Sequence, residues 1–271
     1  MTTLREEMAG AARSLAEAGC QTPRLDAELL LAHVLGIDRA QLVMRAAEEA
    51  AADDRTRYLA LLTRRVRREP VAYILGRREF RHITLVVDPR VLIPRPETEL
   101  LVEVGLTLAA GARVCDVGTG SGAVALALKH ERPDLQLTGA DVSAGALSVA
   151  RMNGQRLGLQ VEWVHSDLLE DVGGCEAVFA NLPYVADQEL LPPEVAGYEP
   201  REALLGGPDG LELIRRLVRQ AGHRPGVSLV ALEVGDTQAA ATEELLRGAG
   251  FAAVERRRDL AGIERVVVGR R

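Results

Sequence analysis

Four consecutive residues, Asn181, Leu182, Pro183 and Tyr184, place an amide, a proline and an aromatic ring directly after the apolar run 177–180. The amide offers a carbonyl acceptor, and Pro183 biases Leu182 toward an extended backbone that can present its own carbonyl. We expect these two acceptors and the Tyr184 ring to form a socket for a planar NH2 group. The alternative is an ordinary proline-containing turn with a buried tyrosine at a strand end.

A planar NH2 group is a weak nucleophile, because its lone pair is delocalised into the neighbouring carbonyl or aromatic ring. Two acceptors that take both N–H bonds would orient the nitrogen and stabilise the positive charge that develops as it attacks an electrophilic methyl. S-adenosylmethionine carries such a methyl, and the nitrogen becomes acidic once it is methylated. The socket therefore predicts methyl transfer without an essential general base.

A second candidate site is the glycine-rich loop 118–122, between a predicted strand and a predicted helix. Its glycines permit positive φ and let a ligand approach the backbone closely. Asp141 ends the next strand, about twenty residues further on, where it can accept both hydroxyls of a ribose or cap the helix at Ser143. Asp167 ends the third strand and can accept from an adenine amino group or cap a turn. From this pattern we predict an adenosine-containing cofactor held by Gly118, Thr119, Gly120, Ser121, Gly122, Asp141, Asp167, Leu168 and Asn181.

The glycine loop alone leaves the cofactor open, because with Ala123 it also fits the G-x-G-x-x-G/A pattern of dinucleotide-binding proteins. A nicotinamide oxidoreductase would need an acid or base at the hydride site, and the sequence shows no candidate. It would also leave the residues 181–184 unexplained. S-adenosylmethionine accounts for both segments.

These residues require strands whose carboxyl ends meet at one edge of a sheet. From about residue 112 onward, apolar strands alternate with helical segments, which predicts an α/β fold with a doubly wound, mostly parallel sheet. The first third of the chain has helical periodicity, and two apolar runs around Asp88-Pro89 predict a hairpin. We expect a helical domain over 1–78, a hairpin linker over 79–95 and a methyltransferase domain over 96–271.

Composition and charge argue against several classes of protein. The chain is 47% apolar and 27% charged, which is typical of globular proteins, and its net charge of −6 argues against a general nucleic-acid binder. No apolar run reaches the roughly 20 residues that span a bilayer, and the N-terminus lacks a secretory pattern, so we expect the cytoplasm. Scattered cysteines and histidines predict free thiols and no metal site.

Two arginine-rich segments, 64–70 and 76–82, stand out against the acidic average. They suit a solvated helix face followed by a hairpin. They also suit a docking surface for an acidic or RNA-bearing partner.

Longer segments carry a family resemblance. DVGTGSG (116–122), followed by Asp141, resembles the cofactor motif of class I S-adenosylmethionine-dependent methyltransferases, and NLPY (181–184) resembles their Asn-Pro-Pro-Tyr signature for planar amino groups. EPVAYILGRREF, VLIPRPETELLVE, YEPREALLGGPDGL and RRDLAGIERVVVGR resemble, in that order, the peptide chain release factor glutamine methyltransferase (PrmC/HemK) family. The resemblance spans nearly the whole chain.

This resemblance implies methylation of the glutamine amide in the Gly-Gly-Gln motif of class 1 peptide chain release factors, which yields N5-methylglutamine and S-adenosylhomocysteine. Asn181 and Leu182 would accept the amide hydrogens, Pro183 would shape the loop, and Tyr184 would pack against the amide. Leu182 stands where the family usually has proline, a change that affects the rigidity of the loop.

The resemblance also implies roles for two further segments. The segment 93–99 would cover the cofactor, with Arg95, Glu97 and Thr98 as its polar contacts. The helical N-terminal domain would help to hold the release factor, with no membrane and no direct nucleic acid required.

Other activities would use the same socket. A ribosomal-protein glutamine methyltransferase is similar in fold and differs mainly at the N-terminus. A nucleic-acid adenine N6 methyltransferase needs a basic groove and a recognition domain for its flipped base, which an acidic chain does not suggest. A non-catalytic binding protein with this fold is disfavoured by the intact glycine loop, Asp141 and Asn181.

Overall fold

The computed structural model describes residues 2–271, which form two compact units. Unit 1 takes in the chain up to Gly76 together with Leu191–Tyr198. Unit 2 consists of Arg77–Leu190 and Glu199–Arg271. No helix in the described part of the chain is long and apolar enough to cross a bilayer.

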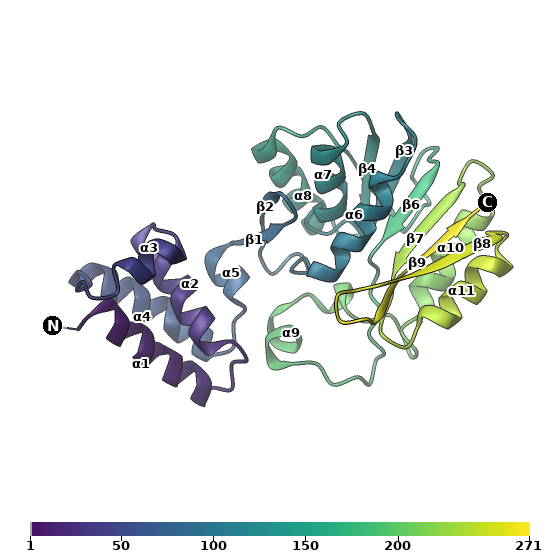
Figure 1. The fold of residues 1–271 in the computed structure, drawn as a ribbon. Coiled ribbons are helices and arrows are strands. Elements are labelled where there is room, and N and C mark those ends of the chain that lie inside the picture. Colours follow the sequence, from purple (N-terminus) through teal and green to yellow (C-terminus); the bar gives the residue numbers. More distant parts are fainter. Residues whose placement is uncertain (1) are drawn as a thin grey trace. The chain divides into compact units, whose positions relative to one another are not determined.

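Unit 1 is helical, as the periodicity predicts. Its helices are α1 (Leu4–Glu17), α2 (Pro23–Leu35), α3 (Arg39–Met44), α4 (Ala52–Val66), α5 (Val71–Leu75) and α9 (Pro193–Tyr198) (Figure 1). Helix α1 begins in a capping box in which Thr3 and Glu6 satisfy each other's backbone N–H groups. Helix α2 ends at Gly36 in the left-handed conformation. Leucines of α1, α2 and α3 pack around Tyr58 of α4 to form the core of this unit.

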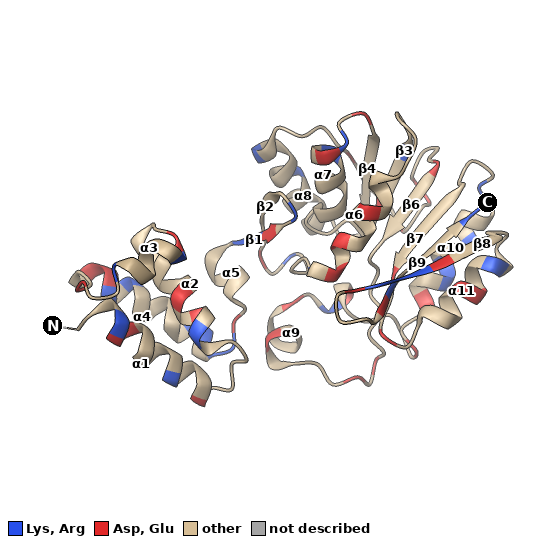
Figure 2. Ribbon diagram, viewed as in Figure 1, with Lys and Arg blue, Asp and Glu red and all other residues tan. Residues whose placement is uncertain are grey.

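The short helix α9 joins unit 1 although it lies far along the chain, which the residue pattern did not predict. Its Glu194 accepts hydrogen bonds from Arg65 and Arg68 at the end of α4. Arg65 is only 5% exposed and also pairs with Asp26 of α2, at 2.7 Å. Arg64 pairs with a neighbouring glutamate. Three of the four arginines in segment 64–70 therefore make ion pairs within unit 1, where basic and acidic residues are interspersed (Figure 2).

The residues described in unit 2 form a seven-stranded, mostly parallel sheet, so the predicted fold class is confirmed. The strand order is β5-β4-β3-β6-β7-β9-β8, and β9 pairs antiparallel with both β7 and β8. The strands are β3 (Arg113–Val117), β4 (Gln136–Asp141), β5 (Glu162–His165), β6 (Ala177–Ala180), β7 (Leu229–Glu233), β8 (Ala253–Arg258) and β9 (Glu264–Arg270).

Helices cover both faces of this sheet (Figure 1). The helices α6 (Glu99–Leu106), α7 (Ala123–Glu131) and α8 (Ala144–Leu157) lie on one face, and α10 (Glu212–Gly222) and α11 (Ala239–Gly248) lie on the other. Alternate residues of each central strand enter separate cores: Phe179 packs with the first group of helices, and Val178 with the second. Burial on both faces explains why these strands are continuous apolar runs.

The predicted hairpin exists, but the position that we expected for its turn is wrong. Strands β1 (Arg77–Phe80) and β2 (Ile83–Val86) are joined at Arg81 and His82, not at Asp88-Pro89. The N–H and C=O of Val86 bond to the side chain of Asn153 on α8, and Pro89 has no N–H for a ladder. The apolar run after Pro89 therefore leaves the hairpin, and part of it lines the cleft described below.

Candidate active site

The parallel strands deliver polar residues to one edge of the sheet. Val117 lies opposite both Ala140 and Ala180, and Ala180 lies opposite Leu232. The residues that follow these positions, namely Gly118, Asp141, Asn181 and Glu233, therefore meet at the carboxyl edge. In open α/β sheets this edge is where ligands bind.

A cleft of about 1050 Å³, its open mouth included, lies at this edge. Most of the residues that we predicted for the site line it: Thr98, Gly118, Thr119, Gly120, Ser121, Asp141, Asp167, Leu168, Asn181, Leu182 and Pro183. The structure thus brings together five places that are separate in the sequence, at Thr98, 118–121, Asp141, 167–168 and 181–183. Pro200, Glu202 and Ala203 also line the cleft and were not predicted.

Four predicted site residues are not part of the cleft wall: Arg95, Glu97, Gly122 and Tyr184. Arg95 pairs with the buried Glu199 at 2.5 Å, and the same carboxylate accepts the N–H of Ile93. Arg95 therefore fastens the segment 93–98. The contact of these four residues with a ligand stays a prediction.

The glycine loop is held by a buried carboxylate that sequence reasoning left out of the site. Gly118 and Gly120 have φ of 70° and 56°, values that favour glycine. Asp116, at the end of β3, accepts the Thr119 hydroxyl at 2.6 Å and the Ala125 N–H at 3.2 Å. Burial raises the pKa of Asp116 to about 6, although both hydrogen bonds favour its charged form. The signal in the sequence that could have identified Asp116 is a charged residue inside an apolar strand.

Asp141 supports the loop and the following helix with one side chain. Its Oδ2 accepts the Gly120 N–H at 2.9 Å, and its Oδ1 accepts the Ser143 N–H at 2.8 Å. The helix cap itself is the Ser143 hydroxyl, which accepts from Ala146. A carboxylate has about four acceptor sites, so Asp141 keeps acceptor capacity for a ligand. Burial raises the pKa of Asp141, and these N–H groups oppose that shift.

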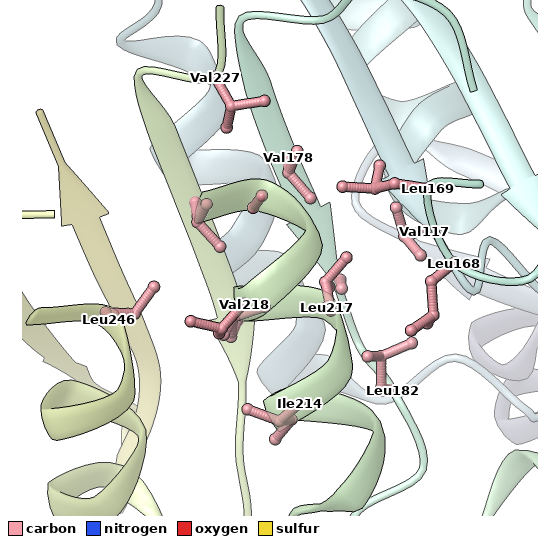
Figure 3. Packing of buried hydrophobic residues seen from close by; sticks show 14 of the residues in the cluster. Val117, Leu168, Leu169, Val178, Leu182, Ile214, Leu217, Val218, Val227 and Leu246 are labelled. Atoms are coloured by element: carbon pink, nitrogen blue, oxygen red, sulfur yellow. The ribbon is translucent and has the colours of Figure 1, made fainter. Parts of the chain in front are cut away.

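Asp167 and Leu168 form the opposite wall of the cleft. Asp167 Oδ2 accepts from Arg216 at 2.6 Å. Leu168 has a φ of 56°, which is rare for a residue with a side chain and persists only where the surroundings enforce it. Its side chain packs beside Leu182 and Leu217 (Figure 3). The core below the cleft therefore fixes the backbone at this wall.

Asn181 makes a contact that connects two of the predicted motifs. Its Nδ2 donates to the Thr98 hydroxyl at 3.1 Å, and Thr98 ends the 3-10 helix η1 (Pro96–Thr98). The amide orientation that makes this bond turns Oδ1 away from Thr98. Leu182, next in the chain, is 4% exposed and anchors the turn in the core beneath α10 (Figure 3).

The segment 206–210 clamps the rest of the turn. A Cβ on Gly206 would lie 2.4 Å from the Pro183 carbonyl oxygen, and one on Gly210 would lie 2.1 Å from the Tyr184 carbonyl oxygen. Gln238 Nε2 donates to that same Tyr184 oxygen at 2.9 Å. The glycines of GGPDGL therefore allow the backbone to approach the turn that bears Asn181.

Glu233 is the second buried carboxyl at this edge, and sequence reasoning missed it. It is 1% exposed, and burial raises its pKa to about 7. The signal in the sequence was a glutamate directly after the apolar run 229–232.

Two family models match this chain, and a solved structure shares its fold. Residues 8–76 match the family model described as the PrmC N-terminal domain, and residues 96–193 match the methyltransferase small domain. A methyltransferase structure from Pyrococcus furiosus, 18% identical, shares the fold with a TM-score of 0.51 over 69% of this chain and 87% of that chain.

Curated relatives are more similar in sequence. The release factor glutamine methyltransferase of Burkholderia pseudomallei is 45% identical over 262 residues, which cover 91% of each chain. The protein of the same name from Geobacter sulfurreducens is 39% identical over 275 residues, which cover 99% of this chain and 96% of that one. Such identity over nearly the full length confirms the resemblance seen in the motifs: the chain belongs to the release factor glutamine methyltransferase family.

Proposed function

We propose that this protein transfers the methyl group of S-adenosylmethionine to the glutamine side-chain amide in the Gly-Gly-Gln motif of class 1 peptide chain release factors. The observation that carries the proposal is the position of Asn181. Its amide donates to the Thr98 hydroxyl just after the carboxyl end of β6, beside a cleft that fits an adenosine-containing cofactor. The relatives' shared name supports the substrate. Because that substrate is a translation factor, we place the reaction in the cytoplasm.

The residues of the cleft fit S-adenosylmethionine. A Cβ on Gly118 would lie 3.0 Å from the Leu182 side chain, and its φ of 70° also favours glycine, so the loop lies close to the Asn181 turn. The spare acceptor sites of Asp141 would hold the ribose hydroxyls. Asp167 and the backbone of Leu168 would hold the adenine, and the glycine loop would lie against the rest of the cofactor. When bound, the cofactor supplies the electrophilic methyl.

The substrate amide would bind where two protein acceptors converge. Asn181 Oδ1 and the Leu182 carbonyl would each take one N–H, which localises the nitrogen lone pair for attack. Pro183 shapes the turn, and Tyr184 packs on the amide. Burial raises the pKa of Tyr184 to about 12, so its ring stays neutral at physiological pH. The proton of the methylated nitrogen leaves to water, without a dedicated base.

We also propose that unit 1 holds the body of the release factor while the glutamine enters the cleft. Arg65 and Arg68 of segment 64–70 already bind Glu194 within the unit, so they are less available for this contact than the exposed Arg67. No nucleic acid or membrane is needed for this arrangement.

Methyl transfer to competing substrates tests the proposal. The protein would be incubated with radiolabelled S-adenosylmethionine and, separately, unmethylated release factor, ribosomal proteins and an adenine-containing RNA. We expect label on the release factor alone. Label on ribosomal protein or RNA at an equal rate would contradict the proposed substrate. Calorimetry with S-adenosylhomocysteine and with NAD checks the cofactor independently, since only the former is expected to bind.

A further inference from the structure

Glu233 ends β7 at the position next to Asn181, one strand away. The parallel register pairs Ala180 with Leu232, so the residue after each lies at the same level of the edge. Glu233 is 1% exposed, and within the described residues its Oε2 has no hydrogen-bond partner. Leaving a carboxyl oxygen buried and unpaired is costly, which indicates that the carboxyl serves the site beside it.

Thr98 interacts with both Asn181 and Glu233. Its hydroxyl is close enough to the Glu233 carboxyl to stabilise the charged form, and its oxygen accepts the Asn181 Nδ2 at 3.1 Å. Thr98 is itself 4% exposed, so water does not compete freely for this hydroxyl. The three side chains form a continuous polar path from the core to the cleft.

The hydrogen bonds of the Thr98 hydroxyl have a fixed direction, because a hydroxyl group has a single proton to donate. The Thr98 oxygen accepts from Asn181, and an ionised Glu233 carboxylate can only accept, so the Thr98 proton is available to Glu233 and the lone pair is presented to Asn181. Asn181 then has to turn its NH2 group toward Thr98 and its Oδ1 toward the cleft. If Thr98 gave its proton to Asn181 instead, the amide would turn over and present an NH2 group to the substrate's NH2 group, which it cannot bind.

We propose that Glu233 is a positioning residue: acting through the Thr98 hydroxyl, it fixes the orientation of the Asn181 amide in which Oδ1 accepts from the substrate. This role rests on the proposed amide methylation and adds to it the group that makes Asn181 an acceptor. Glu233 itself touches neither substrate nor cofactor.

The surroundings of Glu233 make this role sensitive to pH. Its pKa is raised to about 7: burial and Glu97 raise the pKa, and Thr98, Arg265 and Arg95 lower it, while the neutral Tyr184 lies alongside. Below about pH 7 the protonated carboxyl can donate to Thr98, and the orientation of Asn181 is no longer imposed. The rate of transfer should therefore fall as the pH drops through this value.

Kinetics with the full-length protein test the proposal. The parameters kcat and KM for unmethylated release factor would be measured between about pH 5.5 and about pH 9. The proteins compared are the wild type, Glu233→Gln, Thr98→Val and Thr98→Ser. We expect the wild-type kcat to fall about tenfold per pH unit below pH 7. Glu233→Gln and Thr98→Val should each lower kcat at pH 8 at least tenfold, abolish this acidic limb and leave KM within about twofold. Thr98→Ser should recover most of the loss and the limb.

A variant that carries both substitutions shows whether Glu233 and Thr98 act on Asn181 in series or independently. Glu233→Gln combined with Thr98→Val should be no slower than Thr98→Val alone, because the two side chains act in series. The exposed Glu244→Gln on α11 is the matched control and should leave the pH profile unchanged. S-adenosylhomocysteine binding by each variant verifies that the cleft is folded.

A second readout does not depend on turnover. The side-chain amide signals of Asn181 in a nitrogen-15 NMR spectrum should shift with an apparent pKa near 7 in the wild type and not in Glu233→Gln. If the wild type is active and Glu233→Gln has the same kcat, pH profile and NMR titration, only the role of Glu233 is overturned, and the proposed function stands. A wild type that binds S-adenosylhomocysteine but methylates no release factor would overturn the proposed function and this role with it.

Discussion

Leu182 stands where the family signature has proline, and its burial explains how the turn keeps its shape. A proline would restrict the backbone of the turn directly. Here the leucine side chain packs with Leu168 and Leu217, so tertiary packing restrains the same backbone.

Leu182→Ala should therefore destabilise the fold and slow catalysis together. We expect a loss of about 2–4 kcal/mol in the free energy of unfolding, because a buried leucine is replaced by a cavity. Urea denaturation measures this loss, and kcat for release factor should fall in parallel. Leu190→Ala, at a position 96% exposed, is the control and should change stability by less than about 0.5 kcal/mol. Equal stability of the two variants would contradict the anchoring role.

Asp116 predicts a pH dependence of stability. Its folded pKa, about 6, lies above the ordinary value of 3.8, so the protonated form is favoured in the folded state. The stability that this group contributes is complete below about pH 4 and is lost as the pH rises through 6, a change of roughly 3 kcal/mol. The difference in unfolding free energy between wild type and Asp116→Asn, measured by urea denaturation from pH 4.5 to 7, should fall accordingly. A difference that is independent of pH would refute this assignment.

At the scale of elements, the clamp on the Asn181 turn depends on Gly210. Its φ of 73° and the short approach to the Tyr184 carbonyl together exclude a side chain. Gly210→Ala should lower kcat more than tenfold, because the backbone clash must displace the turn. Gly111→Ala is the matched control, since Gly111 has a φ of 74° and nothing within 4 Å of the added Cβ. It should cost about 1 kcal/mol of stability and no activity. Similar kcat values for the two variants would show that the clamp is not needed.

Periodicity and motifs predicted the elements that local sequence determines. Asp141 and Asn181 could be assigned because each ends a recognisable strand after a recognisable loop. The contact between Asn181 and Thr98 could not, since it depends on where a separate helix meets the sheet. The hairpin turn was misplaced because Asp88-Pro89 does form a turn, while the buried Asn153 takes the backbone groups of Val86.

At the scale of the whole molecule, unit 1 gains a helix from a distant part of the chain. Helix α9 is short and shows no periodic signal in the sequence, and its Glu194 is held in place by Arg65 and Arg68. Substituting the arginines of segment 64–70 would therefore disturb unit 1 itself. A test of release factor docking has to use other residues.

Exposed apolar residues on α3 offer that test. Val43 and Met44 are 61% and 77% exposed, next to each other on a short helix. If unit 1 holds the release factor through this helix, replacing both with Glu should raise KM for intact release factor at least fivefold and leave the rate on a short Gly-Gly-Gln peptide unchanged. Leu260→Glu, an exposed apolar residue of unit 2, is the control. An unchanged KM for intact release factor would exclude docking by α3.

The central claim is that Asn181 binds a release factor glutamine as it accepts a methyl group. The most direct measurement is tandem mass spectrometry of the Gly-Gly-Gln peptide after wild type or Asn181→Ala has acted on unmethylated release factor with deuterated S-adenosylmethionine. We predict a single labelled methyl on the glutamine amide with the wild type and none with the variant, although the variant still binds S-adenosylhomocysteine. A methyl on another residue, or equal labelling by both proteins, would contradict the account.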